Sequence, residues 1–261
     1  MKSLKTFTLL LFISAAAFAQ QSVLKSGIDA FNRRAEGATG LQATAGNIDQ
    51  AITHLKKALL SIADEEKATV YLMRSYYFKG TFVETEKDKR KAVYDLSKAL
   101  GEKQIVKFPK SAAVHYWYLA NMAKWGETSG IMKAAKEGLA DLLFTLCNKV
   151  IELDPAYSYG AGYRMLGVIH YKTPYIPFLI SWPDNDDAIL NLEKSLEYKS
   201  DHLMGQLYLA QVYHNKGRKP EAIKMWEKVA AGTANPEYLL EEGKDIKEAK
   251  EFLAKHKKKQ K

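Results

Sequence analysis

The chain has 261 residues, 47% of them hydrophobic, which is enough to bury a continuous core. Its 16 glycines and 7 prolines are too few for an all-β protein rich in turns, and its single cysteine excludes a disulfide bond within the chain. The net charge of +9 is concentrated near the two ends, so the body of the chain is close to neutral. We therefore expect a nearly all-helical protein.

The N-terminus has the pattern of a secretory signal peptide. Lys2 and Lys5 precede an apolar run over residues 7–18, and Ala17-Phe18-Ala19 forms a small-x-small cleavage site. We expect residues 1–19 to be removed, leaving a soluble, periplasmic protein without a lipid anchor. A transmembrane anchor is the alternative interpretation, but about 20 apolar residues are needed to span a bilayer and this run is shorter. No other stretch predicts a membrane span.

The first helices after the signal are predicted from apolar spacing. A helix over residues 23–34 and a Gly/Ala/Thr-rich linker over residues 35–46 make up an N-terminal segment, residues 20–47. A second helix follows, with an inner stripe of Ala51, Leu55, Ala58 and Leu59. We expect this helix to pair with residues 23–34.

Two helical hairpins follow in the sequence. The first pairs a helix carrying Leu72, Met73, Tyr76 and Gly80 with one carrying Ala92, Leu96, Ala99 and Leu100, through a charged turn over residues 83–91. The second pairs Tyr116, Leu119 and Ala120 with Leu143, Cys147, Val150 and Ile151. Its second helix is predicted to begin near Ser129 and to end before Pro155, because the residue before a proline disfavours the helical region.

The stretch over residues 154–198 is the most unusual part of the chain. Tyr163, Leu166, Gly167 and His170 share one face of a predicted helix, and a second helix follows the run Asp184-Asn185-Asp186-Asp187, with Ala188, Leu192, Ser195 and Leu196 facing inward. Residues 173–183 lie between these helices and are strongly apolar, with the large side chains Tyr175, Ile176, Phe178, Leu179, Ile180 and Trp182. A solvated turn does not require such residues.

Residues 203–234 match a repeat pattern. Gln206, Leu209, Ala210, Tyr213, Gly217, Ala222, Trp226 and Val229 occupy the positions where the 34-residue tetratricopeptide pattern has its characteristic residues. The alanines allow two antiparallel helices to approach, and Gly217 permits the tight turn. The preceding hairpins repeat this pattern with insertions, and residues 236–255 predict a capping helix. We therefore predict an all-α, tetratricopeptide-like helical hairpin solenoid over residues 48–256, followed by a basic tail over residues 257–261.

Three segments indicate a more specific resemblance: AAVHYWYLANMAKWGE (residues 112–127), VIELDPAYSYGAGYRMLG (150–167) and YKTP (171–174). They resemble the T component of tripartite ATP-independent periplasmic (TRAP) transporters, TatT. The resemblance implies a bent solenoid with a hydrophobic cleft or pore, which associates with a periplasmic solute-binding protein. The chain departs from the family in lacking the lipid-anchoring cysteine and in having Tyr175 to Pro183 where a glycine-rich turn is expected.

No catalytic or metal-binding pattern is present in the sequence. The six histidines have no metal-ligand spacing, and His170 occupies a place where a repeat normally has a core tyrosine. The run from Asp184 to Asp187 lacks the glycine and terminal glutamate of a calcium loop and is better interpreted as a helix cap. Cys147 lies on an apolar helix face, which is typical of a buried, inert thiol. We therefore expect a non-enzymatic protein without a metal or cofactor.

Aromatic residues give the candidate binding surface. The candidates are Trp117, Trp125, Tyr159, Tyr163, Tyr175, Phe178 and Trp182. The apolar insertion either closes the groove of its own solenoid or lines a functional pocket. Two functions follow: an accessory that binds a solute-binding protein, a hydrophobic small ligand or both, as in a TRAP-type transport system, or a scaffold that binds another exported protein and no small ligand. Oligomerisation is compatible with both, and neither involves nucleic acid.

Overall fold

The computed structural model describes residues 23–176, 178 and 180–257. The predicted signal peptide (residues 1–19), Leu179 of the insertion and the last four residues of the basic tail lie outside this part of the chain. The chain divides into two compact units, one ending at Phe108 (unit 1) and one beginning at Pro109 (unit 2). In the described residues the regular structure is helical, with two isolated β-bridges, Thr39 to Gln42 and Ile176 to Ile180. None of the described helices has both the length and the hydropathy needed to cross a bilayer.

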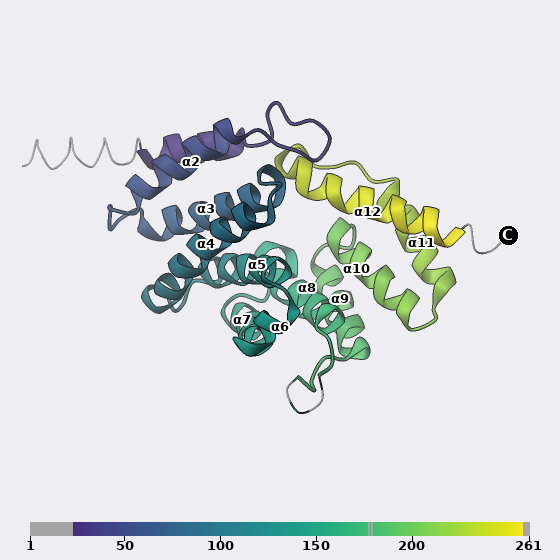
Figure 1. Ribbon diagram of the computed structural model, residues 1–261. Helices are drawn as coiled ribbons and strands as arrows, with labels where there is room; N and C mark the ends of the chain where they lie inside the picture. The colour runs from purple at the N-terminus through teal and green to yellow at the C-terminus, as the bar shows by residue number, and fades with distance from the viewer. Residues whose placement is uncertain (1–22, 177, 179, 258–261) are drawn as a thin grey trace, which may run out of the picture. The chain divides into compact units, whose positions relative to one another are not determined.

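Unit 1 consists of helical hairpins. A helix over residues 23–32 precedes α2 (Ala45–Ala58), α3 (Glu65–Phe78), a short π-helical turn η1 (Lys79–Val83) and α4 (Lys87–Lys107) (Figure 1). The first helix lies directly against α2, since a Cβ atom added to Gly27 would be 2.8 Å from Leu55 Cγ. This contact confirms the pairing predicted for the two N-terminal helices.

The predicted register of α4 is wrong. Ala92, Leu96 and Ala99 were expected to face inward, but all three are exposed, Leu96 by 51%. The buried residues of α4 are Val93, Tyr94, Ser97, Gly101 and Gln104. The helix also begins at Lys87, inside the predicted turn.

Contact with Gly80 explains the register of α4. A Cβ atom on Gly80 would be 2.5 Å from the Tyr94 ring, and the Tyr94 hydroxyl lies 3.0 Å from the Thr81 hydroxyl. The space left by the missing side chain of Gly80 therefore receives Tyr94. This contact fixes which face of α4 turns inward, regardless of where the alanines and leucines fall.

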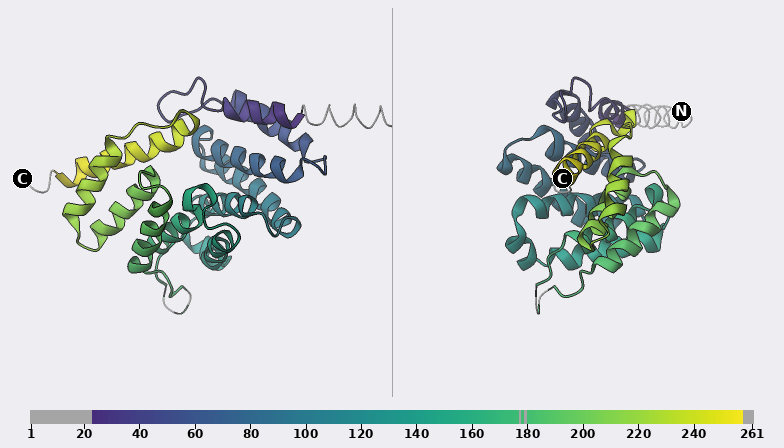
Figure 2. Two further views of the ribbon diagram at one scale, coloured as in Figure 1. Left: turned by 180° about the vertical axis from the view of Figure 1, so that it is seen from behind. Right: turned by 90° about the vertical axis from the view of Figure 1, so that its right-hand side faces the viewer.

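Unit 2 is a succession of helices in which each packs against the one before it. It contains α5 (Ala112–Ser129), α6 (Ile131–Lys136), α7 (Leu139–Leu153), α8 (Tyr157–Lys172), α9 (Asn185–Tyr198), α10 (Leu203–Asn215), α11 (Lys219–Ala230), the 3-10 turn η2 (Pro236–Tyr238) and α12 (Leu239–Lys257). From α7 onward, sequential helices lie side by side (Figures 1 and 2). This arrangement is the one expected of a helical-repeat solenoid.

One predicted helix of unit 2 is broken into two. The helix expected from near Ser129 is instead α6 and α7, which are separated by a turn at Gly138. Gly130 and Gly138 have φ angles of +93° and +67°, outside the helical region, and glycine adopts such angles without strain. The other end is as predicted, because α7 stops at Leu153, just before Asp154 and Pro155.

The hairpin of α10 and α11 confirms the repeat register. The predicted core residues Gln206, Leu209, Ala210, Tyr213, Ala222, Trp226 and Val229 are all buried, and Gly217 has a φ of +80° in the turn. The predicted capping helix is α12, whose Phe252 ring stacks on Trp226 with centroids 5.0 Å apart. The last helix therefore covers the apolar face of the last hairpin.

The helices α8 and α9 pack closely against each other at Gly167. A Cβ atom at this position would be 2.6 Å from Leu192 Cγ and 2.8 Å from the carbonyl oxygen of Ala188. Ala188 and Leu192 are fully buried, as predicted for the inner face of α9. The absence of a side chain at Gly167 thus allows the two helices that flank the apolar insertion to pack directly against each other.

Ala210 and Ala99 give a matched test of which faces of α10 and α4 are buried. We expect Ala210→Phe to lower the free energy of unfolding by ~1–3 kcal/mol, because it overpacks a buried helix contact. Ala99→Phe should change it by less than ~0.5 kcal/mol, because Ala99 is exposed. Urea denaturation of both variants measures the difference, and equal losses would contradict the corrected register of α4.

Gly167 and Gly46 provide a second matched pair. Gly167→Ala should be clearly destabilising, by more than ~1 kcal/mol, since the new methyl group meets main-chain atoms of α9 that cannot rotate away. Gly46, inside α2, has no atom within 4 Å of an added Cβ, so Gly46→Ala should be neutral or stabilising by up to ~1 kcal/mol. Thermal and urea unfolding test both. A harmless Gly167→Ala would show that α8 and α9 can separate without cost.

Candidate functional site

The start of α8 is a left-handed turn. Ser158, Tyr159 and Gly160 have φ angles of +46°, +59° and +70°, and the buried Arg164 side chain, 3% exposed, donates hydrogen bonds to the carbonyl oxygens of Tyr159 at 3.1 Å and Ser158 at 3.4 Å. These charge-assisted bonds hold the unusual turn. As a result the Tyr159 ring is exposed, with Lys199 Nζ 5.1 Å from its centre.

The insertion between α8 and α9 is a small hairpin that projects from the helices (Figures 1 and 2). Ile176 and Ile180 exchange two main-chain hydrogen bonds, of 2.9 and 2.8 Å. Between them Phe178 has a positive φ of +63° and is fully exposed, and Tyr175 is 63% exposed. Ile180 is buried. The insertion therefore has a packed base and two exposed aromatic side chains.

Trp182 anchors the base of the insertion. Its ring packs against Phe144 of α7 and His170 of α8, with centroids 4.9 and 5.1 Å apart, and its Nε1 donates to Asp141 Oδ1 at 3.1 Å. Trp182 is therefore held by three residues of α7 and α8. It supports the insertion, and its ring is not displayed at the tip.

The aspartate run after the insertion caps α9, as the sequence predicts. Asp184 Oδ1 accepts hydrogen bonds from the main-chain N–H groups of Asp186 and Asp187, at 2.6 and 3.2 Å, and these bonds hold the pKa of Asp184 below its ordinary value. The N–H of Asp184 donates to Nδ1 of buried His170 at 3.3 Å. In the described part of the chain, no three His, Cys, Asp or Glu side chains are grouped to bind a metal.

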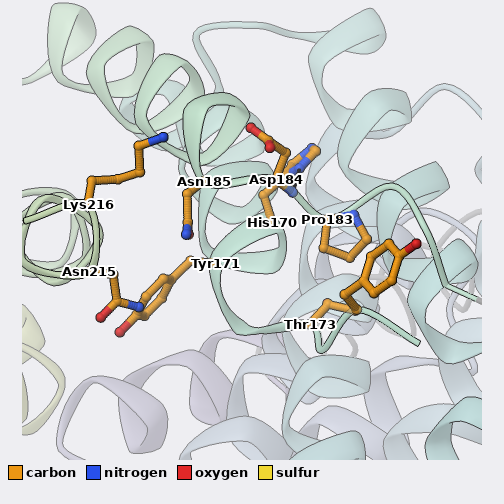
Figure 3. Close-up of a pocket in the computed structure, with 9 residues that line it drawn as sticks. His170, Tyr171, Thr173, Pro183, Asp184, Asn185, Asn215 and Lys216 are labelled. Carbon is orange, nitrogen blue, oxygen red and sulfur yellow. Dashed lines mark hydrogen bonds between the residues drawn. The ribbon is translucent and has the colours of Figure 1, made fainter. Parts of the chain in front are cut away.

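A pocket of about 320 Å³ lies beside the insertion. It is formed by the end of α8, the two arms of the insertion, the start of α9 and the end of α10 (Figure 3). Its lining is largely polar: His170, Tyr171, Thr173, Tyr175, Pro183, Asp184, Asn185, Asn215 and Lys216. Lys216 Nζ lies 2.8 Å from Asp186 Oδ1, so this cation is already paired. The pocket therefore differs in character from the hydrophobic cleft that the family resemblance implies.

The seven candidate binding residues lie in three separate places. Tyr175, Phe178 and Trp182 belong to the insertion. Tyr159 and Tyr163 lie at the start of α8, where Tyr163 stacks on Tyr198 with centroids 6.1 Å apart. Trp117 and Trp125 belong to α5.

The two tryptophans of α5 have different environments. Trp117 is half-buried and lies edge-on to Tyr116, while Trp125 is 2% exposed within the core. Of the seven candidates, Tyr175 alone lines the pocket.

Sequence reasoning missed the polar lining of the pocket. None of Tyr171, Thr173, Asn185, Asn215 and Lys216 was predicted to be a binding residue. The available signal was weak: Asn215 and Lys216 directly precede the turn at Gly217, and Asn185 lies within the capping run. Bringing these segments together requires the packing of α10 on α8 and α9, which the sequence alone does not specify.

Cys147 and two polar pairs of unit 2 are weaker candidates for a binding site than the insertion. Cys147 is fully buried, and burial raises the pKa of its thiol, as expected of an inert core cysteine. Lys124 pairs with Glu127 at 2.7 Å, and Gln211 donates to Glu248 at 2.9 Å. Because Lys124 and Glu127 neutralise each other and Glu248 already accepts a hydrogen bond, these groups favour a binding role less than the insertion does.

Comparison with known proteins supports the fold and shows no family to which the chain belongs. No protein-family model matches the chain, and no curated protein matches it in sequence. Among solved structures, a thermophilic tetratricopeptide-repeat protein of Thermus thermophilus is similar, with a TM-score of 0.59 and 14% identity over 90% of this chain and 97% of that one. The chain is therefore an all-α, tetratricopeptide-like helical-repeat protein. At this identity the similarity establishes the fold alone.

The hydrogen bond between His170 and Asp184 predicts a pH effect. Burial lowers the pKa of His170, against the opposite effect of the Asp187 and Asp184 carboxylates. The unfolded chain, with a histidine pKa of ~6.5, therefore takes up the proton first. The stabilisation is complete above pH ~6.5 and is lost as the pH falls through the lower pKa of the folded state. Wild-type stability should fall more steeply between pH ~7 and ~5 than that of His170→Gln.

The measurement is chemical denaturation at several pH values for both proteins. His170→Gln keeps an acceptor for the Asp184 N–H but cannot titrate. Because both proteins contain every other titrating group, the difference between their curves isolates His170. Parallel curves would contradict the assigned role of neutral His170.

Proposed function

We propose that this chain is a non-enzymatic helical-repeat protein that binds a polypeptide partner through the insertion and the pocket beside it. The observation that carries this proposal is the exposure of Tyr175 and Phe178 on a hairpin whose base is packed. Large aromatic side chains held in solvent usually mark an interaction site on a soluble protein. Partner binding would bury them.

The burial pattern of the insertion favours binding over closure of its own groove. A loop that closed its own groove would bury its large side chains against the helices. Here Ile180 is buried and Trp182 is packed against Phe144 and His170, while Tyr175 and Phe178 point outward. The packed residues Ile180 and Trp182 thus hold the insertion in place, and the exposed Tyr175 and Phe178 are available to contact a partner.

The chemistry of the site favours a protein partner over a hydrophobic small ligand. Ligand pockets for apolar molecules are lined mainly by apolar side chains, whereas this pocket is lined by histidine, asparagine, aspartate, lysine, threonine and tyrosine. The candidate aromatics also do not converge on one cavity. Two exposed aromatic side chains on a projecting hairpin, next to a polar recess, are suited to a protein surface, where aromatic anchors contribute much of the binding energy.

The resemblance to the TRAP T component supplies a hypothesis for the partner. On that hypothesis the partner is a periplasmic solute-binding protein, and the predicted signal peptide would carry this chain to the compartment of such a partner. The alternative is an interaction scaffold for another exported protein. Both share the same binding surface, so the surface can be tested before the partner is known.

The experiment is site-specific photocrosslinking in cells that export the protein. A benzoylphenylalanine residue replaces Phe178, and a matched control replaces Leu190, which is also exposed, by 65%, on the neighbouring α9. We expect one discrete crosslinked partner from position 178 and none from position 190. Tyr175→Ser with Phe178→Ser should abolish co-purification of this partner while leaving the melting temperature within ~2 °C, because neither side chain is buried.

Two results would contradict the proposal. Equal crosslinking at positions 178 and 190 would show that the insertion is not selective. A partner that still co-purifies with the double serine variant would place the binding surface elsewhere on the repeats. Native mass spectrometry of the wild type gives a separate test of the small-ligand alternative, since a bound ligand would appear as a fixed mass increase.

A further inference from the structure

We propose that unit 1 docks on a lipid bilayer surface through exposed aliphatic side chains at one of its ends. These side chains are Leu60, Ile62 and Val106, which are 82%, 92% and 78% exposed. They are the three most exposed large aliphatic side chains among the described residues. Contiguous apolar surface of this kind marks a protein or a membrane contact. The inference concerns a different unit from the proposed function and does not rest on it.

The end of α4 is held beside the start of α3, which brings Val106 to the same end of unit 1 as the connection between α2 and α3 (Figures 1 and 2). Gln104 Nε2 donates to Glu65 Oε1 at 3.3 Å, and Lys107 Nζ forms an ion pair with the same carboxylate. Val106 lies in this last turn of α4 and points into solvent. The three aliphatic side chains therefore belong to one surface.

The connection between α2 and α3 displays its two aliphatic side chains from an ordered backbone. The Leu60 N–H donates to the Lys57 carbonyl oxygen at 3.2 Å, and the Ser61 N–H donates to the Ala58 carbonyl oxygen at 3.0 Å. Leu60 and Ile62 follow directly along the chain. Because the backbone is already bonded, insertion of these side chains into lipid costs little additional backbone entropy.

The N-terminal helix begins at this same end of unit 1. The helix over residues 23–32 runs antiparallel to α2, because Asn47 Nδ2 donates to the Arg33 carbonyl oxygen at 2.8 Å while Gly27 packs on Leu55. Residue 23 therefore lies beside the last turn of α2. The 22 residues that precede it, with the predicted signal peptide, join unit 1 here. Since a signal peptide enters the membrane during export, this end would be the one nearest the bilayer.

The chemistry of the three side chains favours lipid over a protein partner. Energetic hot spots of protein interfaces are enriched in tryptophan, tyrosine and arginine, whereas leucine and valine are under-represented there. Here the most exposed side chains are all aliphatic. A bilayer needs no complementary shape, and it can bury aliphatic side chains in its acyl boundary while charged groups stay in the headgroup layer.

Exposed lysines flank the aliphatic side chains on all three helices. Those without a carboxylate at ion-pair distance among the described residues are Lys56, Lys57, Lys67 and Lys103. Such side chains can reach headgroup phosphates while their stems lie along apolar surface. Three carboxylates, Asp64, Glu66 and Glu102, lie at the same end, so the surplus is one positive charge. Anionic lipid should therefore increase the affinity only modestly.

The first test is co-sedimentation of the exported, processed protein with vesicles of phosphatidylethanolamine and phosphatidylglycerol, mixed at about 70:30, or of phosphatidylcholine alone. We expect Leu60→Ser with Ile62→Ser to lower the partition coefficient roughly ten-fold or more, because it removes the inserting side chains. The control, Leu96→Ser with Leu190→Ser, changes two leucines that are 51% and 65% exposed elsewhere, and it should stay within about two-fold. Phosphatidylglycerol should strengthen wild-type binding by about two- to five-fold.

A fluorescent probe reads the contact at a single position, irrespective of lipid binding by any other segment. The environment-sensitive dye nitrobenzoxadiazole is attached at position 62 in Ile62→Cys and, as the control, at position 190 in Leu190→Cys. The one native cysteine, Cys147, is fully buried, so labelling is selective. Vesicles should raise the emission and shift it to shorter wavelength at position 62 and leave it unchanged at position 190.

Three results would overturn the bilayer as the occupant. The wild type would fail to bind either kind of vesicle, the double serine variant would bind as well as its control, or the dye at position 62 would not respond. A concentration-dependent dimer, seen by analytical ultracentrifugation and lost in Leu60→Ser with Ile62→Ser, would also overturn it if vesicles were not bound. That result would assign this end of unit 1 to contact between two copies of the chain.

Discussion

The close contact between α8 and α9 at Gly167 is the constraint on which the candidate site depends. With no side chain at this position, Leu192 and the Ala188 carbonyl occupy the space that a Cβ atom would need. His170 follows Gly167 by one helical turn on the same face, and α9 begins one turn before Ala188. The helix contact therefore brings the two ends of the insertion together, so that the Asp184 N–H reaches His170 Nδ1 at 3.3 Å. The projection of the hairpin is a consequence of this closure.

Because both ends are fixed, the insertion can display aromatic side chains at small conformational cost. A free loop would lose backbone entropy, about 1–2 kcal/mol per ordered residue, each time it bound a partner. Here the two main-chain bonds between Ile176 and Ile180 and the packing of Trp182 on Phe144 and His170 fix the base of the hairpin in advance. Such preorganisation improves affinity without additional contacts. It also gives Trp182 a positioning role that its large aromatic ring alone does not reveal.

The sequence predicted those parts of the fold in which local chemistry and packing agree. At α10 and α11 the repeat pattern, the alanines and the turn glycine all indicate the same hairpin, and its core is buried as expected. At α4 they disagree: hydrophobic spacing favoured Ala92, Leu96 and Ala99, but the fit of Tyr94 against Gly80 turned a different face of the helix inward. Gly138, with a φ of +67°, likewise broke the helix that was expected to continue from near Ser129 to Asp154. The fit between side chains of different helices and the backbone angles of glycine determined these two features. Hydrophobic spacing in the sequence carries no information about either.

The candidate site was predicted in part for the same reason. The apolar insertion was recognisable as an anomaly in the sequence, but composition cannot distinguish an anchor such as Trp182 from a displayed residue such as Phe178. Trp125 has the same chemistry and is core. The polar pocket was missed because Asn215 and Lys216 reach it only through the packing of α10. Sequence therefore identified the segment, and tertiary packing assigned roles to its residues.

The two halves of the candidate site offer different chemistry to the proposed partner. The exposed aromatics Tyr175 and Phe178 provide apolar area, which gives affinity with little selectivity, and the pocket provides charge and hydrogen-bonding groups, which discriminate among partners. On the proposed function, the aromatic side chains would therefore supply the larger part of the affinity, and the pocket would select which partners remain bound.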